Sequence, residues 1–314
     1  MKKKISIITP CYNEELSIAE CVLEVRRVFE QELPEYELEH IFCDNCSTDN
    51  TVKILKDFAK TDRRIKIIVN SRNFGIFKSN FNGVMNATGD AAMLLVPADL
   101  QDPPSLIPQF VRQWEKGYEI VYGMRARREE NIITCLIRKA YYRILSRLTY
   151  VNYPPDAGDF QLVDRVVLNV MKQIDDAQPF MRMMTFDCGF KSYGISYTWK
   201  ARKHGFSNNG FGHMIVQGIN GIISFSSAPL RLALFFGIIL SGLSILYAFI
   251  IGVLALTGQI PEAARGVPTV LVALFFFGGV QLFFVGVLGE YILAIYNQVR
   301  KKPLVIERER INFD

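Results

Sequence analysis

The stretch KISIITPCYNEE, residues 4–15, decides the fold of the N-terminal part of the chain. Its first half is a short apolar run that ends at Pro10, which predicts a buried β-strand. Its second half is a polar turn, and a helical pattern follows it to about residue 29. A buried strand, a polar turn and a helix form the repeating unit of a parallel α/β sheet.

The same unit recurs along the chain. Strands that alternate with helices at this spacing predict an α/β fold with a mostly parallel sheet covered on both faces. Such sheets bind ligands beyond the carboxyl ends of their strands, where polar clusters follow the strands at residues 12–15, 44–49 and 99–102. The further strands are expected at residues 36–43, 65–70, 91–96 and 119–122, and the helices at 51–59, 77–86 and 105–116.

Composition and motifs exclude several classes of protein. The chain has 314 residues and a formal net charge of +5, which does not suggest a nucleic-acid partner. It contains neither G-x-G-x-x-G nor G-x-x-x-x-G-K-[ST], so it lacks the phosphate loops of dinucleotide oxidoreductases and P-loop NTPases. Cys43 and Cys46 have no second Cys or His pair to complete a zinc site, and we expect the six cysteines to be free thiols.

Two long uncharged stretches occupy the C-terminal part, at residues 232–256 and 267–289. As helices, each would reach roughly 35 Å and could cross a hydrocarbon core of about 30 Å. Buried core helices are the alternative. The linker 257–266 is short, so the two spans would form a hairpin within residues 231–299, and residues 300–314 would be a tail.

The basic residues predict the orientation of this hairpin. Arg231 precedes the first span, and Arg300, Lys301 and Lys302 follow the second. Because Lys and Arg are retained on the cytoplasmic side, we expect a multi-pass inner-membrane protein with its catalytic domain and both termini in the cytoplasm. No secretory signal opens the sequence.

Two amphipathic segments are predicted beside the membrane. Residues 132–150 place Lys139, Arg143 and Arg147 four apart on one face, which is typical of an interfacial helix with a basic rim. An amphipathic core helix is the alternative. A juxtamembrane segment at 213–230 leads to the first span, which leaves residues 1–212 as the catalytic domain.

The third polar cluster is rich in oxygen atoms. Asp99 and Gln101 lie two apart and can point the same way from an extended backbone. Hard cations such as Mg²⁺ or Mn²⁺ accept one or two protein oxygens and take the rest from phosphates and water. The alternative is an ordinary helix N-terminus capped by Asp102.

Four motifs follow one another along the chain. They are Ile8-Thr9-Pro10-Cys11-Tyr12-Asn13-Glu14-Glu15, Asp44-Asn45-Cys46-Ser47-Thr48-Asp49, Ser71-Arg72-Asn73-Phe74-Gly75 and Ala98-Asp99-Leu100-Gln101-Asp102-Pro103-Pro104. In order and spacing they resemble the motifs of the family-2 inverting glycosyltransferases, and the branch that the chain resembles most is the polyprenyl-phosphate branch of dolichyl-phosphate mannose synthase and bactoprenol glucosyltransferase. The resemblance covers nearly the whole chain and implies a GT-A-like domain.

The resemblance implies a donor site. Asp99 and Gln101 match the positions that hold Mg²⁺ or Mn²⁺ against the diphosphate, and Asp99 also faces the nucleotide. The chain departs from the family pattern at Pro97 and Asn45, where relatives have carboxylates. The residues implied for the nucleotide are Pro10, Tyr12, Glu14 and Asp44.

The resemblance also implies an acceptor site downstream. A catalytic Asp is expected in the block 156–165, with Asp159 the first choice and Asp156 the second, although either could cap the helix that begins near Asp164. Lys200 or Lys203 could replace a phosphate-binding Lys of the branch. The residues implied for the lipid phosphate are Arg125, Arg128, Arg202 and Ser207.

The expected activity is transfer of a sugar from a UDP- or GDP-linked donor to a polyprenyl phosphate, with inversion. The expected partners are these two substrates and the lipid bilayer, and the spans could join the chain into a homo-oligomer. A processive polysaccharide synthase is one alternative, but its Gln-x-x-Arg-Trp block is missing. A non-catalytic membrane homologue is another, since Pro97 and Asn45 each replace a carboxylate. A transporter is a third alternative, but the two predicted spans contain no charged residue that could line a transport pathway.

Overall fold

A computed structural model describes most of the chain, in two compact units that we treat separately. The first unit combines the N-terminal region with the C-terminal end of the chain, and the second contains two long helices. The predicted interfacial helix at 132–150 and most of the predicted juxtamembrane segment at 213–230 lie outside the described residues. The described residues are 2–127, 154, 157–198 and 301–313 in the first unit, and 226–257 and 267–300 in the second.

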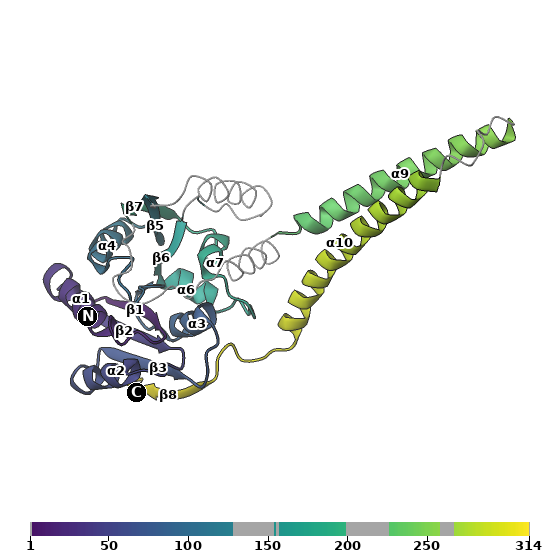
Figure 1. Ribbon diagram of the computed structural model, residues 1–314. Coiled ribbons are helices and arrows are strands. Elements are labelled where there is room, and N and C mark those ends of the chain that lie inside the picture. The colour runs from purple at the N-terminus through teal and green to yellow at the C-terminus, as the bar shows by residue number, and fades with distance from the viewer. Residues whose placement is uncertain (1, 128–153, 155–156, 199–225, 258–266, 314) are drawn as a thin grey trace. The chain divides into compact units, whose positions relative to one another are not determined.

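The described part of the first unit contains an eight-stranded sheet in the order β7-β5-β6-β4-β1-β2-β3-β8 (Figure 1). The strands β4, β1, β2 and β3 are parallel, as are β5 and β7, while β6 and β8 run antiparallel to their neighbours. The fold is therefore α/β with a mostly parallel sheet, as predicted. The bounds are β1 (Lys4–Cys11), β2 (Glu37–Asp44), β3 (Ile65–Asn70), β4 (Ala91–Met93), β5 (Ile120–Arg127), β6 (Ala157–Asp164), β7 (Ser192–Thr198) and β8 (Glu307–Ile311).

Helices cover both faces of this sheet, because alternate strand residues point to opposite faces. Ile7 belongs to the core beneath α1 and α4, whereas its neighbour Ile8 belongs to the core beneath α3, α6 and α7. The short helix α2 packs beside α1 over Phe42. The bounds are α1 (Ile18–Glu32), α2 (Thr51–Thr61), α3 (Ile76–Asn86), η1 (Pro104–Leu106), α4 (Ile107–Glu115), α6 (Arg165–Met171) and α7 (Met181–Asp187).

The predicted strand at 91–96 is only half as long in the structure. Regular pairing ends at Met93, yet the backbone stays bonded on both sides. The amide of Leu94 donates to the carbonyl of Gln161 on β6 (2.8 Å), and the amide of Val96 donates to the carbonyl of Ile8 on β1 (2.8 Å). The segment that leads to Asp99 is therefore held between two strands.

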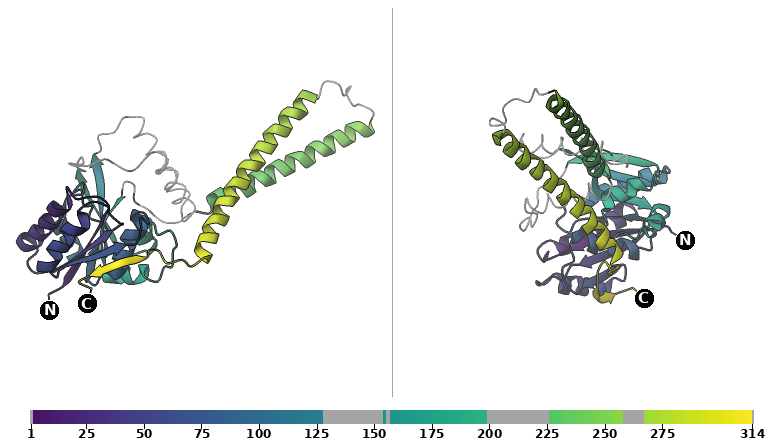
Figure 2. Two further views of the ribbon diagram at one scale, coloured as in Figure 1. Left: turned by 60° about the horizontal axis from the view of Figure 1, so that its bottom comes forward. Right: turned by 90° about the vertical axis from the view of Figure 1, so that its right-hand side faces the viewer.

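The C-terminal end of the chain extends the sheet, although the sequence indicated only a tail there. The strand β8 lies beside β3 and pairs with it (Figure 2). Leu304 and Phe313 pack against the hydrophobic core. Asn312 has a left-handed backbone (φ 60°), and its side-chain amide donates to the carbonyls of Ala59 (3.0 Å) and Ile65 (2.9 Å). The end of the chain is thus fastened to the first unit by side-chain as well as backbone bonds.

Replacing Asn312 by alanine should destabilise the first unit. Two carbonyls lose their donor, and we expect the free energy of unfolding to fall by about 1–3 kcal/mol. Thermal unfolding of the full chain in detergent measures this. Lys56→Ala is the control, because it removes only the exposed ion pair with Glu309 (2.7 Å), which is worth about 0–1 kcal/mol. Equal melting temperatures for the two variants would contradict the prediction.

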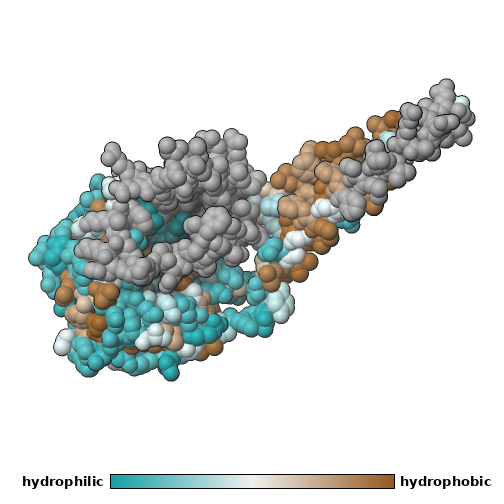
Figure 3. All heavy atoms as spheres, viewed as in Figure 1, coloured by the Kyte–Doolittle hydropathy of each residue, from teal (hydrophilic) through white to brown (hydrophobic). Residues whose placement is uncertain are grey.

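The second unit contains α9 (Ala228–Leu256) and α10 (Val267–Val299). Both helices are long and apolar enough to cross a membrane, with mean hydropathy of 2.0 over Ala228–Tyr247 and 1.7 over Phe276–Val299. None of the residues in these two windows is buried, and apolar side chains dominate the visible surface of the pair (Figure 3). This exposure argues against the alternative of buried core helices.

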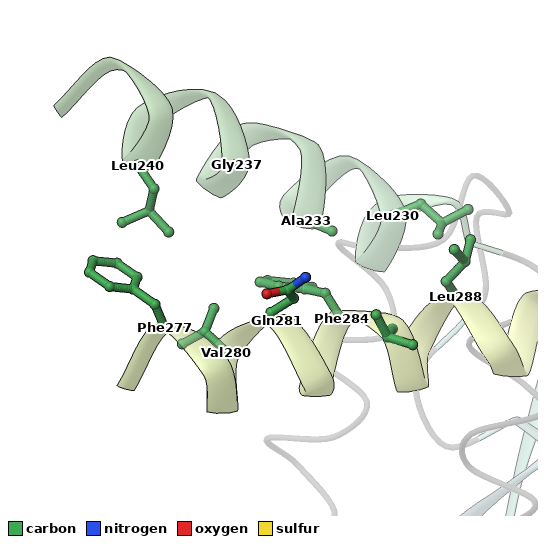
Figure 4. Close-up of a pocket in the computed structure, with 10 residues that line it drawn as sticks. Leu230, Ala233, Gly237, Leu240, Phe277, Val280, Gln281, Phe284 and Leu288 are labelled. Atoms are coloured by element: carbon green, nitrogen blue, oxygen red, sulfur yellow. The ribbon is translucent and has the colours of Figure 1, made fainter. Parts of the chain in front are cut away.

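An apolar groove with a volume of about 410 Å³ runs between the two helices (Figure 4). Leu240 of α9 faces Phe277 of α10, and Leu230 lies near Leu288. Gln281 supplies a polar side chain among the groove residues. Near the same end as Leu288, the hydroxyl of Tyr291 donates to the carbonyl of Ser226 (2.6 Å).

Candidate active site

The first two polar clusters interlock at the carboxyl edge of the sheet, because β1 and β2 are adjacent and parallel. The amide of Asn13 donates to the hydroxyl of Ser47 (2.9 Å), and the amide of Thr48 donates to the Asn13 side chain (2.8 Å). The amide of Glu15 donates to Asp49 (3.1 Å). Asn13 has a left-handed backbone (φ 56°), which a short polar side chain tolerates. The two loops form one surface.

The residues predicted to bind the nucleotide lie on these two strands and loops. Pro10 is buried in β1, whereas Tyr12 and Glu14 are partly exposed in the loop that follows. Asp44 is fully buried at the end of β2, where its carboxylate accepts from the amide of Ser47 (3.0 Å). Burial raises the pKa of Asp44, against the lowering effect of the Ser47 bonds. The structure brings these four predicted residues together, and their role remains a prediction.

Asn45 joins the ends of β2 and β3 to the loop 71–75. Its side-chain amide donates to the Oδ1 of Asn73 (2.8 Å), and its Oδ1 accepts from the amide of Phe74 (2.9 Å) and from the Nδ2 of Asn70 (3.3 Å). The side-chain amide of Asn45 thus both donates and accepts hydrogen bonds, whereas a carboxylate has no hydrogen to donate. The departure of Asn45 from the family pattern therefore has a structural role in this chain.

Replacing Asn45 by aspartate should lower stability. The new carboxylate would face the Asn73 oxygen without a proton to share, in a site where Asn45 is 5% exposed. Burying a polar group without its bond costs about 1–3 kcal/mol, more when it is charged. Denaturant unfolding measures the loss. The control Gln31→Glu makes the same change on the exposed face of α1, where the side chain only accepts from Arg27 (3.0 Å). Asn45→Asp with wild-type stability would refute the role of the amide.

The loop that follows β4 carries the predicted metal ligands. The carboxylate of Asp99 accepts from the amide of Gln101 (3.1 Å), and both side chains are partly exposed. Leu100 between them has a left-handed backbone (φ 58°), which costs about 1–2 kcal/mol for a residue other than glycine. Such strain is found at functional loops.

The chemistry of this loop fits a hard divalent cation. Asp99 offers carboxylate oxygens and Gln101 an amide oxygen, and both are ligands that Mg²⁺ and Mn²⁺ accept. No group of three or more His, Cys, Asp or Glu side chains comes together among the described residues. A hard cation held by two protein oxygens usually takes its further ligands from phosphate groups and water.

Asp102 does not cap the helix that follows it, so that alternative is wrong. Its side chain is 3% exposed and pairs with Arg125 of β5 (3.0 Å). It also accepts a hydrogen bond from the hydroxyl of Tyr197 on β7. Arg125, predicted to bind the lipid phosphate, thus already binds a carboxylate of the loop that follows β4, and its phosphate role remains a prediction.

Asp159 lies on β6 and pairs with Arg182 of α7, whose Nε is 3.2 Å from Oδ1 and whose Nη2 donates to Oδ2. Because the bond from Leu94 to Gln161 continues the antiparallel register, the residues of β6 that precede Gln161 run beside the segment leading to Asp99. Asp159 does not cap α6, because Asp164 caps that helix itself by accepting from the amide of Val166 (2.8 Å).

Arg182 and Tyr197 were missed by the sequence analysis. The signal for Arg182 was a single charged residue in the otherwise uncharged and mostly apolar segment 180–186, and Tyr197 had no distinguishing signal. Four predicted site residues lie outside the described residues, and their roles stay predictions: Arg128, Asp156, Arg202 and Ser207.

Comparison with known proteins finds relatives that align with nearly the whole chain. The chain is 37% identical over 302 residues to the uncharacterized glycosyltransferase YkcC of Bacillus subtilis (strain 168), covering 96% of this chain and 92% of the relative. It is 33% identical to the bactoprenol glucosyl transferase of Shigella phage SfII, covering 96% and 97%. It is also similar to the mannosyltransferase PcManGT from Pyrobaculum calidifontis in complex with GDP-Man and Mn²⁺, at 17% identity and a TM-score of 0.45, covering 96% and 89%.

The family model described as glycosyl transferase family 2 matches residues 6–171, which is more than half of the chain. That range contains most of β1 and the whole of β2 to β6, and it includes Asp44, Asp99 and Asp159. With relatives above 30% identity over nearly the full length, the chain belongs to glycosyltransferase family 2.

Proposed function

We propose that the chain transfers a sugar from a UDP- or GDP-linked donor to a polyprenyl phosphate, with inversion, at the cytoplasmic face of the inner membrane. The observation that carries the proposal is the meeting of the Asp44 loop, the Asp99 loop and Asp159 at one end of the sheet, in a chain that also has two helices of membrane-spanning length. Relatives named bactoprenol glucosyl transferase, aligned over nearly the full length, support the lipid acceptor.

The donor would lie on the loops that follow β1, β2 and β4. Pro10, Tyr12, Glu14 and Asp44 would hold the nucleoside, because they lie at the carboxyl ends of β1 and β2, where the first two loops interlock. Asp99 and Gln101 would hold the cation against the diphosphate. When bound, Mg²⁺ or Mn²⁺ neutralises the charge that develops on the departing nucleoside diphosphate.

The acceptor explains why a strong general base is unnecessary. The second pKa of a phosphate monoester is about 6, so much of the acceptor is already a dianion at neutral pH. A phosphate oxygen attacks the anomeric carbon and forms the new C–O bond, while the bond to the diphosphate breaks and the nucleoside diphosphate leaves. Attack from the opposite face inverts the anomeric centre, so an α-linked donor yields a β-linked lipid. Asp159 would orient the reacting groups.

Membrane attachment completes the proposal. The helices α9 and α10 would cross the bilayer with both termini in the cytoplasm, since their apolar side chains are exposed along the predicted spans and basic residues flank them. The lipid phosphate could then reach the catalytic domain from the membrane surface, where Arg125, Arg128, Arg202 and Ser207 would receive it. Association of the chain through these helices remains a prediction.

A single assay tests the proposal. The purified full chain in detergent is given labelled UDP- and GDP-sugars, polyprenyl phosphate and Mg²⁺ or Mn²⁺, and label is measured in the organic phase. We expect one donor to give a product with one sugar per lipid and inverted configuration. Products with several sugars would favour a processive synthase, retained configuration would refute inversion, and no label with any donor would overturn the proposed acceptor.

A further inference from the structure

The Asp159 carboxylate is held by Arg182 through two donors on one side chain. The Nε of Arg182 lies 3.2 Å from Oδ1 and its Nη2 bonds to Oδ2. Both side chains are mostly buried, at 14% exposed for Asp159 and 21% for Arg182. A planar guanidinium that bonds both oxygens of a carboxylate fixes the rotation of that carboxylate as well as its position.

A second contact fixes the helix that carries Arg182. The hydroxyl of Thr185 donates to the Oε1 of Gln161 (2.7 Å), and the Nε2 of Gln161 donates to the carbonyl of Gly158 (2.9 Å). Thr185 and Gln161 are fully buried. Positions 182 and 185 share one face of α7, and positions 159 and 161 share one face of β6. The helix α7 and the strand β6 are therefore joined by two side-chain contacts, Arg182 with Asp159 and Thr185 with Gln161.

A second arginine–carboxylate pair interacts electrostatically with the pair formed by Arg182 and Asp159. Arg125 pairs with Asp102 of the loop that follows β4, and the positive charge of Arg182 acts on Arg125. The two cations repel each other, and the carboxylate that each arginine binds offsets part of this repulsion. Arg182 has its bonds to Asp159, and Arg125 has its own bonds to Asp102.

We propose that Arg182 is a positioning residue that holds Asp159 in the orientation required for sugar transfer. This inference rests on the proposed function. Arg182 bonds the carboxylate of Asp159, which is expected to orient the reactants. The residues expected to bind the donor, Asp44 and Asp99, accept hydrogen bonds from the amides of Ser47 and Gln101 instead. Loss of Arg182 should therefore reduce kcat and leave donor affinity unchanged.

The test compares Arg182→Ala, Arg182→Lys and Asp159→Asn with the double variant that combines the alanine and asparagine changes. Misplacement of a catalytic group by about 1 Å costs about 10²-fold in rate, so we expect Arg182→Ala to lower kcat about 10²-fold with the donor Kd within about twofold. Arg182→Lys should recover part of the rate, since it restores the charge and one contact. The double variant should be no slower than Asp159→Asn, because Arg182 acts through that carboxylate.

The control variant is Arg165→Ala. Arg165 lies just beyond the other end of β6 and bonds the backbone carbonyls of Ala87 (3.2 Å) and Gly89, so its loss should lower the melting temperature while kcat is kept. Wild-type kcat in Arg182→Ala, or multiplied effects in the double variant, would overturn the inference. Failure of the unmodified chain to label polyprenyl phosphate would instead overturn the proposed function.

Discussion

Replacement of Asp99 by alanine should reduce sugar transfer at least about 10³-fold, because the variant loses the carboxylate expected to hold the cation on the leaving diphosphate. Loss of one preorganised electrostatic contact to developing charge costs about 10²–10³-fold in rate. Loss of the cation itself costs more. Asp99 is partly exposed in a loop and accepts a local hydrogen bond from the amide of Gln101, so we expect the fold to survive. Label in the organic phase, measured at saturating donor, reports the rate.

Chelation and a matched variant separate this effect from general damage. Removing divalent ions with EDTA should abolish transfer by the unmodified chain, and added Mn²⁺ or Mg²⁺ should restore it. Asp57→Ala, which removes only an exposed ion pair with Lys60 (2.8 Å), should keep full activity. Transfer that persists in Asp99→Ala, or in excess EDTA, would show that the loop after β4 does not hold a catalytic cation.

Replacement of Asp159 by asparagine should lower kcat about 10²-fold or more, because misplacing a reacting group by about 1 Å costs about 10²-fold in rate. The asparagine keeps the size of the side chain but loses the charge and one of the two oxygens that Arg182 binds, so its orientation is held less firmly. Donor affinity, measured by titration with the nucleotide-sugar, should change little.

The pH dependence of this variant distinguishes orientation from proton abstraction. The acceptor phosphate is increasingly protonated below its second pKa of about 6. If Asp159 removes that proton, the deficit of Asp159→Asn should grow between pH 8 and pH 5.5. If Asp159 orients the reactants, as we expect, the deficit should stay constant across this range. Full activity of the Asp159→Asn variant would show that Asp159 is not the catalytic aspartate, and Asp156 would then be the remaining candidate.

The sequence predicted the parallel half of the sheet because that half is encoded locally. Residues 4–9 and 65–70 are largely apolar runs, residues 36–43 end in the apolar stretch 41–43, and each of the three segments is buried along most of its length and is followed by a helical pattern. The resemblance to family 2 was confirmed by the family match and by the full-length relatives. Two long apolar helices were likewise visible, since their composition alone distinguishes them.

The strands β6, β7 and β8 were not predicted, for physical reasons that differ. The strand β6 carries Asp159 and Gln161 among its apolar residues, which obscures the apolar run. The strands β7 and β8 lie at the two edges of the sheet, where side chains are largely exposed and polar residues are favoured. In addition, β8 pairs with a strand more than 200 positions earlier in the sequence, and no local pattern encodes such a partner.

The sequence by itself determined the α/β class, the apolar helix pair and the identity of the polar clusters, because each of these depends on residues close together in the chain. Only the tertiary structure decided which arginine each carboxylate binds. Asp102 pairs with Arg125 and Asp159 pairs with Arg182, and each pair joins separate elements. Such pairing depends on strand order and register, which arise when the whole sheet assembles and its charged side chains must find partners away from water.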